Sequence, residues 1–191
     1  VEQDSLSSED LDDIKHSVET MLRRSDHLQK FVENYRKLAM LPSPKKEKIE
    51  LQVLVDDCLQ IMNPLFKKEE IEVVNSILLK RLIYVDAQQI EQVLINLLTN
   101  SINALKNTSP KQILISAEAK ENRTYIKITD TGNGVEKEIE SKIFLPFFTT
   151  RNEGAGIGLT LSKNIIEAHG GYISFKTEDD KTTFEICLVE G

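Results

Sequence analysis

The chain has 191 residues, of which 40% are hydrophobic and 29% are charged, and its formal net charge is −7. This composition is typical of a globular protein with one full domain and an additional segment. The negative charge argues against nucleic acid as the main partner, because a phosphate backbone binds to a basic surface. No apolar run is long enough to span a bilayer, so any membrane anchor would lie in segments outside this sequence. Cys58 and Cys187 have no pairing motif, so we expect a cytoplasmic location.

Residues 11–40 are predicted to form one long helix with a coiled-coil seam. Positions three and four residues apart alternate along this seam, and its one polar member is Ser25: Leu11, Ile14, Val18, Met21, Ser25, Leu28, Val32, Tyr35 and Ala39. A single helix does not bury such a seam, and no other segment has a matching heptad pattern. We therefore expect the partner to be a second subunit or a helix outside this sequence. The alternative is a helix that packs on its own globular domain.

Pro42 and Pro44 end this helix, so residues 1–44 are expected to be one unit and residues 45–191 a mixed α and β domain. The elements expected in the second unit are, in chain order, strand 49–51, helix 53–66, strands 71–77 and 82–85, helix 87–106, strands 113–119 and 125–129, helix 157–169, and strands 172–177 and 183–189. Asp86 is expected to cap the helix that follows it. Residues 131–156 are predicted to be rich in loops.

The helix predicted at residues 87–106 carries a stripe of amide side chains. Its members lie on one face of the helix, beside an apolar core face: Gln92, Asn96, Asn100 and Asn103. Asparagine is a mediocre helix former, and a solvated helix face normally carries Lys, Glu or Arg. An amide oxygen is a neutral ligand that binds Mg²⁺ beside phosphate oxygens without repelling them. The stripe therefore indicates either a metal and phosphate site or an ordinary polar surface.

Asp130 ends a predicted strand and begins a turn with the sequence Asp-Thr-Gly-Asn-Gly. A buried carboxylate at this point needs a hydrogen-bond donor, and the exocyclic amine of adenine is such a donor. Gly132 and Gly134 allow the backbone to turn and to approach a flat ring closely. The alternative is an ordinary surface turn.

A second glycine cluster, Gly154-Ala-Gly-Ile-Gly158, leads into a predicted helix. Its free backbone amides and the helix N-terminus would form an anion site suited to phosphate. It is not a Walker loop, because no Gly-Lys-Ser/Thr follows. The segment Phe144-Leu-Pro-Phe-Phe-Thr-Thr-Arg151 precedes it and is predicted to be a lid with an aromatic anchor, from which Arg151 could reach a phosphate. The alternative for this segment is a loop packed onto the core.

The order of these four segments resembles the N box, first glycine box, F box and second glycine box of the sensor histidine kinases of two-component systems. This family belongs to the GHKL (Bergerat-fold) ATPases, with type II topoisomerases, Hsp90 and the MutL proteins. The resemblance covers residues 49–190, and Pro146-Phe-Phe-Thr-Thr150 is similar to the nitrogen-regulation branch. It implies an α+β fold: a two-layer α/β sandwich with a mixed sheet, helices on one face and an ATP lid, preceded by one long dimerisation helix.

The resemblance also implies roles for individual residues in binding ATP and Mg²⁺. Asn100 would hold Mg²⁺, Asn96 would contact phosphate or the attacking group, and Asp130 would bind the adenine amine. The other expected cofactor-binding residues are Asn103 on the same helix, Gly132 and Gly134 at the base, Thr149, Thr150 and Arg151 in the lid, Gly154, Gly156, Gly158 and Leu159 at the phosphates, and Thr183 or Thr182 behind the adenine. Superfamily members that hydrolyse ATP carry a glutamate at the position of Asn96, so an asparagine there favours phosphoryl transfer to a protein side chain over hydrolysis.

The phosphoacceptor of the family is a histidine on the first helix of a helical hairpin, typically followed by an acidic residue. His16 is followed by Ser-Val, and its helix leads directly into the ATP domain, which is the position of the second hairpin helix. The resemblance therefore implies a catalytic fragment of a homodimeric kinase, with the acceptor histidine elsewhere and a response-regulator receiver domain as partner. His16 and His27 are expected to be solvated, and His169 to be structural. A hydrolytic ATPase of the same superfamily and a dimerising scaffold with a vestigial site are the alternatives.

Overall fold

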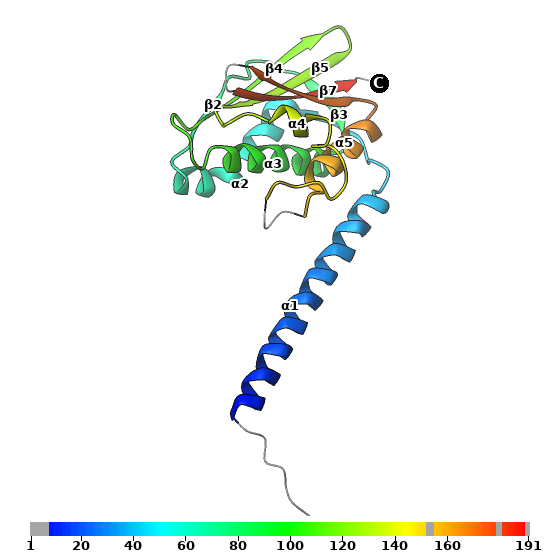
Figure 1. Cartoon of the computed structure of the whole chain (residues 1–191). Helices are drawn as coiled ribbons and strands as arrows, with labels where there is room; N and C mark the ends of the chain where they lie inside the picture. The colour runs from blue at the N-terminus through cyan, green and yellow to red at the C-terminus, as the bar shows by residue number, and fades with distance from the viewer. Residues whose placement is uncertain (1–7, 152–154, 179–180, 190–191) are drawn as a thin grey trace, which may run out of the picture. The chain divides into compact units, whose positions relative to one another are not determined.

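The computed structural model describes residues 8–151, 155–178 and 181–189 (Figure 1). The chain divides into two compact units, Val1–Met40 and Leu41–Gly191. None of the described helices combines the length and the apolar character that crossing a membrane requires.

The described residues of the first unit form one long helix, α1 (Ser8–Ala39), as the heptad pattern predicted. The large apolar residues of the seam are between 47% and 69% exposed, and they are Leu11, Ile14, Val18, Met21, Leu28, Val32 and Tyr35. A helix of this kind gains most of its stability from packing an apolar face against a partner. The exposed seam is therefore a surface that a second helix would cover.

The second unit is built on a mixed sheet of five strands in the order β2-β4-β5-β7-β6. These strands are β2 (Glu72–Asn75), β4 (Gln112–Lys120), β5 (Arg123–Asp130), β7 (Lys181–Val189) and β6 (Tyr172–Glu178). Strand β2 runs parallel to β4, and the other neighbours are antiparallel. A separate antiparallel pair consists of β1 (Glu47–Glu50) and β3 (Leu82–Val85).

Three helices cover one face of the sheet: α2 (Leu51–Lys68), α3 (Ala87–Ala104) and α5 (Gly158–Ala168) (Figure 1). The core lies between the two layers and includes Ile126 and Ile128 of β5, Leu97 of α3 and Ile165 of α5, all at most 1% exposed. Full burial of each such side chain stabilises the fold by roughly 1.5–3 kcal/mol. The predicted two-layer α/β sandwich with a mixed sheet is therefore confirmed.

The differences from the predicted elements are mostly at their ends. Leu51 begins α2 instead of ending a strand, and its side chain is fully buried. The predicted helix 87–106 ends at Ala104. The described part of the segment predicted to be rich in loops contains a short helix, α4 (Lys137–Glu140), which buries no residue. Such a turn of helix has no amphipathic pattern from which it could be predicted.

A hydrogen-bonded junction ties the end of α5 to the start of α3. Asp86 caps α3 as predicted, because its Oδ1 accepts a hydrogen bond of 3.2 Å from Gln89 N. His169 follows α5 and is 3% exposed. Its Nε2 accepts a hydrogen bond of 3.0 Å from Asp86 N. Nδ1 therefore carries the proton, and it donates a hydrogen bond of 2.8 Å to the Ile165 carbonyl. Asp86 Oδ2 also accepts a hydrogen bond of 2.8 Å from Lys45 N. The junction fixes two helices that both contribute to the site described below.

Candidate functional site

A cavity of about 470 Å³ lies where α3, the end of β5, the start of α5 and the lid segment (residues 144–151) meet. Residues from all four predicted segments line it: Asn96, Asn100, Asn103, Asp130, Gly134, Thr149, Thr150, Arg151, Gly156, Gly158 and Leu159. This volume is within the range of pockets that bind small molecules and cofactors. Two predicted residues, Gly132 and Thr183, do not line the cavity. Gly154 lies outside the described residues.

The three asparagines of the amide stripe on α3 line the cavity, whereas Gln92 does not, and each asparagine side chain has a hydrogen-bond partner. Asn96 Nδ2 donates a hydrogen bond of 2.9 Å to Ser162 Oγ. Asn103 Nδ2 donates to the Thr99 carbonyl one turn earlier at 2.7 Å. Both side chains therefore use their nitrogen within the fold and keep their carbonyl oxygen as an acceptor.

Asn100 differs from its neighbours because its oxygen is already engaged. Asn100 Oδ1 accepts a hydrogen bond of 2.9 Å from Arg151 Nη2 of the lid segment. The described residues contain no group of three or more His, Cys, Asp or Glu that could hold a metal ion. A neutral amide oxygen fits a Mg²⁺ ion that receives its other ligands from phosphate and water. The residues present therefore suit a metal that arrives with a phosphorylated ligand.

Asp130 is a buried acceptor at the inner end of the cavity. Its side chain is 2% exposed, its Oδ2 accepts a hydrogen bond of 2.8 Å from Ser101 Oγ, and its Oδ1 accepts one of 3.1 Å from Gly132 N. Burial raises the pKa of Asp130, whereas these two hydrogen bonds lower it. An ionised carboxylate offers about four acceptor positions, so the two bonds leave capacity for a donor on a ligand.

Gly132 contributes to the site indirectly. A Cβ at this position would lie 2.7 Å from Ala104 Cβ and 2.7 Å from Asp130 Oδ1. Only a glycine therefore lets the turn come close enough to α3 for its amide to bind the carboxylate. Gly134, which has a φ of +75°, does line the cavity.

The second glycine cluster brings the start of α5 against α3 and the lid segment. Gly156 has a φ of +66°, and a Cβ there would lie 2.5 Å from the Phe147 carbonyl carbon. A Cβ at Gly158, the first residue of α5, would lie 2.2 Å from Asn96 Oδ1. Both glycines thus permit close approaches at a helix N-terminus, where backbone amides favour an anion.

Phe144 anchors the start of the lid segment on the sheet. Its carbonyl accepts a hydrogen bond of 3.0 Å from Thr160 Oγ1 of α5. Its ring lies 6.1 Å from that of Phe175, which lies 5.9 Å from that of Phe184. Phe184 lines the cavity, so the aromatic contacts run from the lid segment to the cavity wall.

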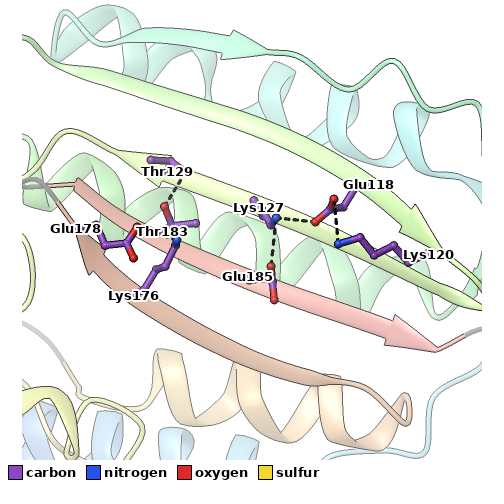
Figure 2. A network of polar contacts seen from close by, with 8 residues as sticks. All are labelled: Glu118, Lys120, Lys127, Thr129, Lys176, Glu178, Thr183 and Glu185. Carbon is purple, nitrogen blue, oxygen red and sulfur yellow. Dashed lines mark hydrogen bonds and ion pairs between the residues drawn. The ribbon is translucent and has the colours of Figure 1, made fainter.

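The alternation of side chains along β7 places Thr182 and Thr183, the two candidate threonines, on opposite faces of the sheet. Thr182 pairs with Asp130 across the sheet, is 3% exposed and lines the cavity. Thr183 faces away from the helices, and its Oγ1 lies 2.9 Å from Thr129 Oγ1. Figure 2 shows Thr129 and Thr183 in the polar network of the outer face, with Glu118, Lys120, Lys127, Lys176, Glu178 and Glu185. Because side chains alternate along a strand, Thr182 replaces Thr183 as a candidate binding residue.

Two kinds of residue at the site escaped the sequence analysis. Ser101 and Ser162 are 1% and 2% exposed and hold Asp130 and Asn96 in place. A serine in a core-facing position of a helix is a signal that would have identified both. The apolar cavity wall also was not foreseen, although its members recur at intervals of four residues: Val135, Ile139 and Ile143.

Several known proteins are similar to this chain in sequence, and several solved structures are similar to it in fold. The sensor histidine kinase ZraS of Salmonella typhimurium is 33% identical over 176 residues, which are 89% of this chain and 37% of ZraS. The chain thus spans little more than a third of this curated relative. The catalytic domain of histidine kinase ThkA superposes with a TM-score of 0.70 at 26% identity, over 76% of this chain and 96% of that domain.

A second structure has the same fold at lower identity. Histidine kinase ThkA, solved in complex with the response regulator protein TrrA, has a TM-score of 0.75 at 22% identity, over 99% of this chain and 54% of that one.

The family model described as histidine kinase-, DNA gyrase B-, and HSP90-like ATPase matches residues 85–190, which include every described residue of the cavity. Because this match extends over more than half of the sequence, the chain belongs to the histidine kinase-, DNA gyrase B- and HSP90-like ATPases.

Proposed function

We propose that this chain is the ATP-binding catalytic part of a sensor histidine kinase. Residues 45–191 would be the catalytic domain, and residues 1–44 the second helix of the dimerisation and phosphoacceptor hairpin with its linker. The observation that carries the proposal is that Asn96, Asp130 and Gly158, far apart in the sequence, line one cavity. A cytoplasmic location and a membrane anchor in other segments of the parent protein belong to the same proposal.

The base end of the cavity would select adenine. Asp130 would accept a hydrogen bond from the exocyclic amine, and Ser101 and Gly132 hold its carboxylate in position. Thr182 lies beside it, and Ile139 and Ile143 provide an apolar wall for the ring. A guanine carbonyl at the same point would meet an acceptor with an acceptor, so we propose that the site rejects guanine nucleotides.

The phosphate end of the cavity would bind and orient the triphosphate. The backbone amides of Gly156, Gly158 and Leu159 lie at the start of α5, where the helix dipole favours anions. Gly154, which lies outside the described residues, belongs to the same proposed phosphate site. Asn100 would supply an amide oxygen to Mg²⁺, and when bound the ion neutralises charge on the phosphates. Thr149, Thr150 and Arg151 of the lid segment and Asn103 complete the proposed binding residues.

Asn96 would orient the reacting groups without acting as a base. A carboxamide does not take a proton from water, so the residue favours transfer to a positioned side chain over hydrolysis. The γ-phosphoryl group would pass to a histidine of the parent kinase, and from there to an aspartate of a response-regulator receiver domain. The complex of ThkA with TrrA supports this choice of partner. His169 is unsuited as the acceptor, because it is buried and both ring nitrogens are hydrogen-bonded.

Nucleotide binding and labelling test the proposal directly. Calorimetry with Mg²⁺ and ATP should detect binding to the 191-residue chain. Incubation with ATP labelled at the γ-phosphate should leave this chain unlabelled and should label a separately added histidine hairpin of the parent kinase. Acid-labile label on this chain would contradict the proposal, steady phosphate release would favour a hydrolytic ATPase, and a lack of ATP binding would favour a vestigial scaffold.

A further inference from the structure

Arg151 and Asn100 are joined by the hydrogen bond of 2.9 Å between Nη2 and Oδ1, although they are 51 residues apart in the sequence. The acceptor oxygen is the atom proposed above as a metal ligand. Asn96 and Asn103 donate hydrogen bonds through their side-chain nitrogens. In Asn100 it is the side-chain oxygen that forms the hydrogen bond, and its donor is the cationic side chain of Arg151.

The cavity has few charged side chains, so the partner of each one matters for how the cavity binds a charged ligand. Among the described residues that line it, Arg151 is the one cationic side chain and Asp130 the one anionic side chain. The Asp130 carboxylate is buried and accepts hydrogen bonds from Ser101 and Gly132. The guanidinium therefore has a neutral carbonyl oxygen as its partner and forms no ion pair with the cavity's carboxylate.

A guanidinium and a divalent cation cannot share this oxygen at short range. Arginine has five donors and no acceptor and stays charged, so it seeks the same carbonyl oxygen as Mg²⁺. Two cations a few ångströms apart repel each other. Metal coordination at Asn100 therefore requires that Arg151 leave the oxygen and find another acceptor.

We propose that Arg151 is a specificity-determining residue that competes with the divalent cation for Asn100 Oδ1. The proposal rests on the proposed function, because it takes Asn100 as the metal ligand. When a nucleoside diphosphate is bound, the guanidinium stays on Asn100, where it opposes binding of the metal. A nucleoside triphosphate offers an additional phosphate as the new acceptor, so the guanidinium moves and the oxygen becomes available. The site thus couples metal binding to the presence of a third phosphate.

The Mg²⁺ dependence of ADP binding tests this competition in the whole chain. Arg151→Ala should lower the Mg²⁺ concentration that gives half-maximal enhancement of ADP binding by about fivefold, which is the equilibrium effect of one typical hydrogen bond. The same variant should weaken binding of the β,γ-imido analogue of ATP. Measurements in about 0.5 M salt, where the Debye length is roughly 4 Å, remove long-range effects of the lost charge.

Two further variants serve as controls for charge. Lys142→Ala removes a lid-proximal cation that does not line the cavity, and it should leave both nucleotides unaffected. Arg151→Lys keeps the charge without the planar fork and should give an intermediate Mg²⁺ midpoint. Circular dichroism of each variant verifies the fold. A Mg²⁺ midpoint in Arg151→Ala equal to that of the unmodified chain would overturn the competition.

Asn100→Ala separates this inference from the proposed function. If Asn100 is the metal ligand, this variant should lose the Mg²⁺ enhancement of nucleotide binding. An enhancement that survives in Asn100→Ala would overturn the metal role of Asn100, and the competition with it. Loss in Asn100→Ala together with an unchanged midpoint in Arg151→Ala would overturn the competition alone.

Discussion

Asn96 and Ser162 join α3 to α5 through a hydrogen bond of 2.9 Å from Nδ2 to Oγ. Ser162 is 2% exposed, and Gly158, one turn earlier on α5, lies so close to the carboxamide that a Cβ would be 2.2 Å from Asn96 Oδ1. The Asn96 side chain is thus fixed between two successive turns of α5. Since α3 carries the amide stripe and α5 begins at the glycine cluster, this contact fixes the position of the amide stripe relative to the glycine cluster.

Ser162→Ala should therefore slow phosphoryl transfer more than it weakens ATP binding. The variant leaves Asn96 Nδ2 without its partner, so the amide can rotate, and it should lower the free energy of unfolding by about 1–2 kcal/mol. We expect single-turnover transfer to an added histidine hairpin to fall about tenfold. Ser141→Ala, at an exposed position after α4, is the matched control. Equal transfer rates in both variants would contradict a positioning role for Ser162.

Asp130→Asn should reduce ATP affinity by about one hundredfold. The substitution keeps the side-chain volume but replaces one acceptor oxygen with a donor, so a ligand amine would meet a nitrogen instead of an oxygen. The loss corresponds to about 3 kcal/mol, at the upper end for a hydrogen bond to a charged group. Calorimetry with ATP measures it, and a thermal unfolding curve checks that the fold survives. Unchanged affinity would exclude Asp130 from the base pocket.

His169 makes the stability of the domain depend on pH. Burial is the main cause that lowers the pKa of His169, and Lys46 adds to it, whereas the Ile165 carbonyl and Asp86 oppose it. The unfolded chain therefore binds a proton more readily than the folded one at a pH below about 6.5. The contribution to stability is complete above that pH and is lost as the pH falls towards the folded pKa.

Urea unfolding at pH 7.5 and 5.5 measures this effect. We expect the unmodified chain to lose more stability between these pH values than His169→Gln, which cannot titrate, because the pKa of His169 is lowered by folding. His169→Gln should be less stable at pH 7.5, because it loses the hydrogen bonds to Asp86 and Ile165. Parallel pH profiles of the two proteins would show that His169 does not couple folding to protonation.

Gly156→Ala and Gly170→Ala form a matched pair that isolates the lid contact. Both glycines have positive φ, +66° and +83°, so each alanine costs roughly 1–2 kcal/mol of backbone strain. A Cβ at Gly156 would also lie 2.5 Å from the Phe147 carbonyl carbon, whereas a Cβ at Gly170 meets nothing within 4 Å. We expect ATP affinity to fall at least tenfold in Gly156→Ala only. A similar loss of affinity in Gly170→Ala would mean that strain alone is responsible.

The exposed seam of α1 predicts association of the chain into dimers. Val18 and Val32 are both 47% exposed and occupy equivalent heptad positions. Replacing both with Asp would place charges in the interface, so sedimentation velocity should show a monomer over a concentration range in which the unmodified chain dimerises. Arg23→Asp, on the opposite side of the helix, should not alter the association. A monomeric unmodified chain at all concentrations would contradict the proposed role of the seam.

The sequence alone determined the elements and the four segments of the site, because those features depend on local pattern. The heptad spacing predicted α1, the alternation around Ile126 predicted β5, and the position of Asp86 predicted the start of α3. Asparagines on one helix face and glycines at element ends are equally local signals, and they predicted Asn96 and Asp130 as site residues.

The tertiary structure alone decided which distant side chains meet. Thr182 and not Thr183 joins the cavity, because the pairing of β7 with β5 places Thr182 opposite Asp130, and a shift of one residue would reverse the two faces. The contact of Arg151 with Asn100 spans 51 residues, and that of Ser162 with Asn96 spans 66. No periodicity encodes such pairs, since they arise only when separately folded elements pack against each other.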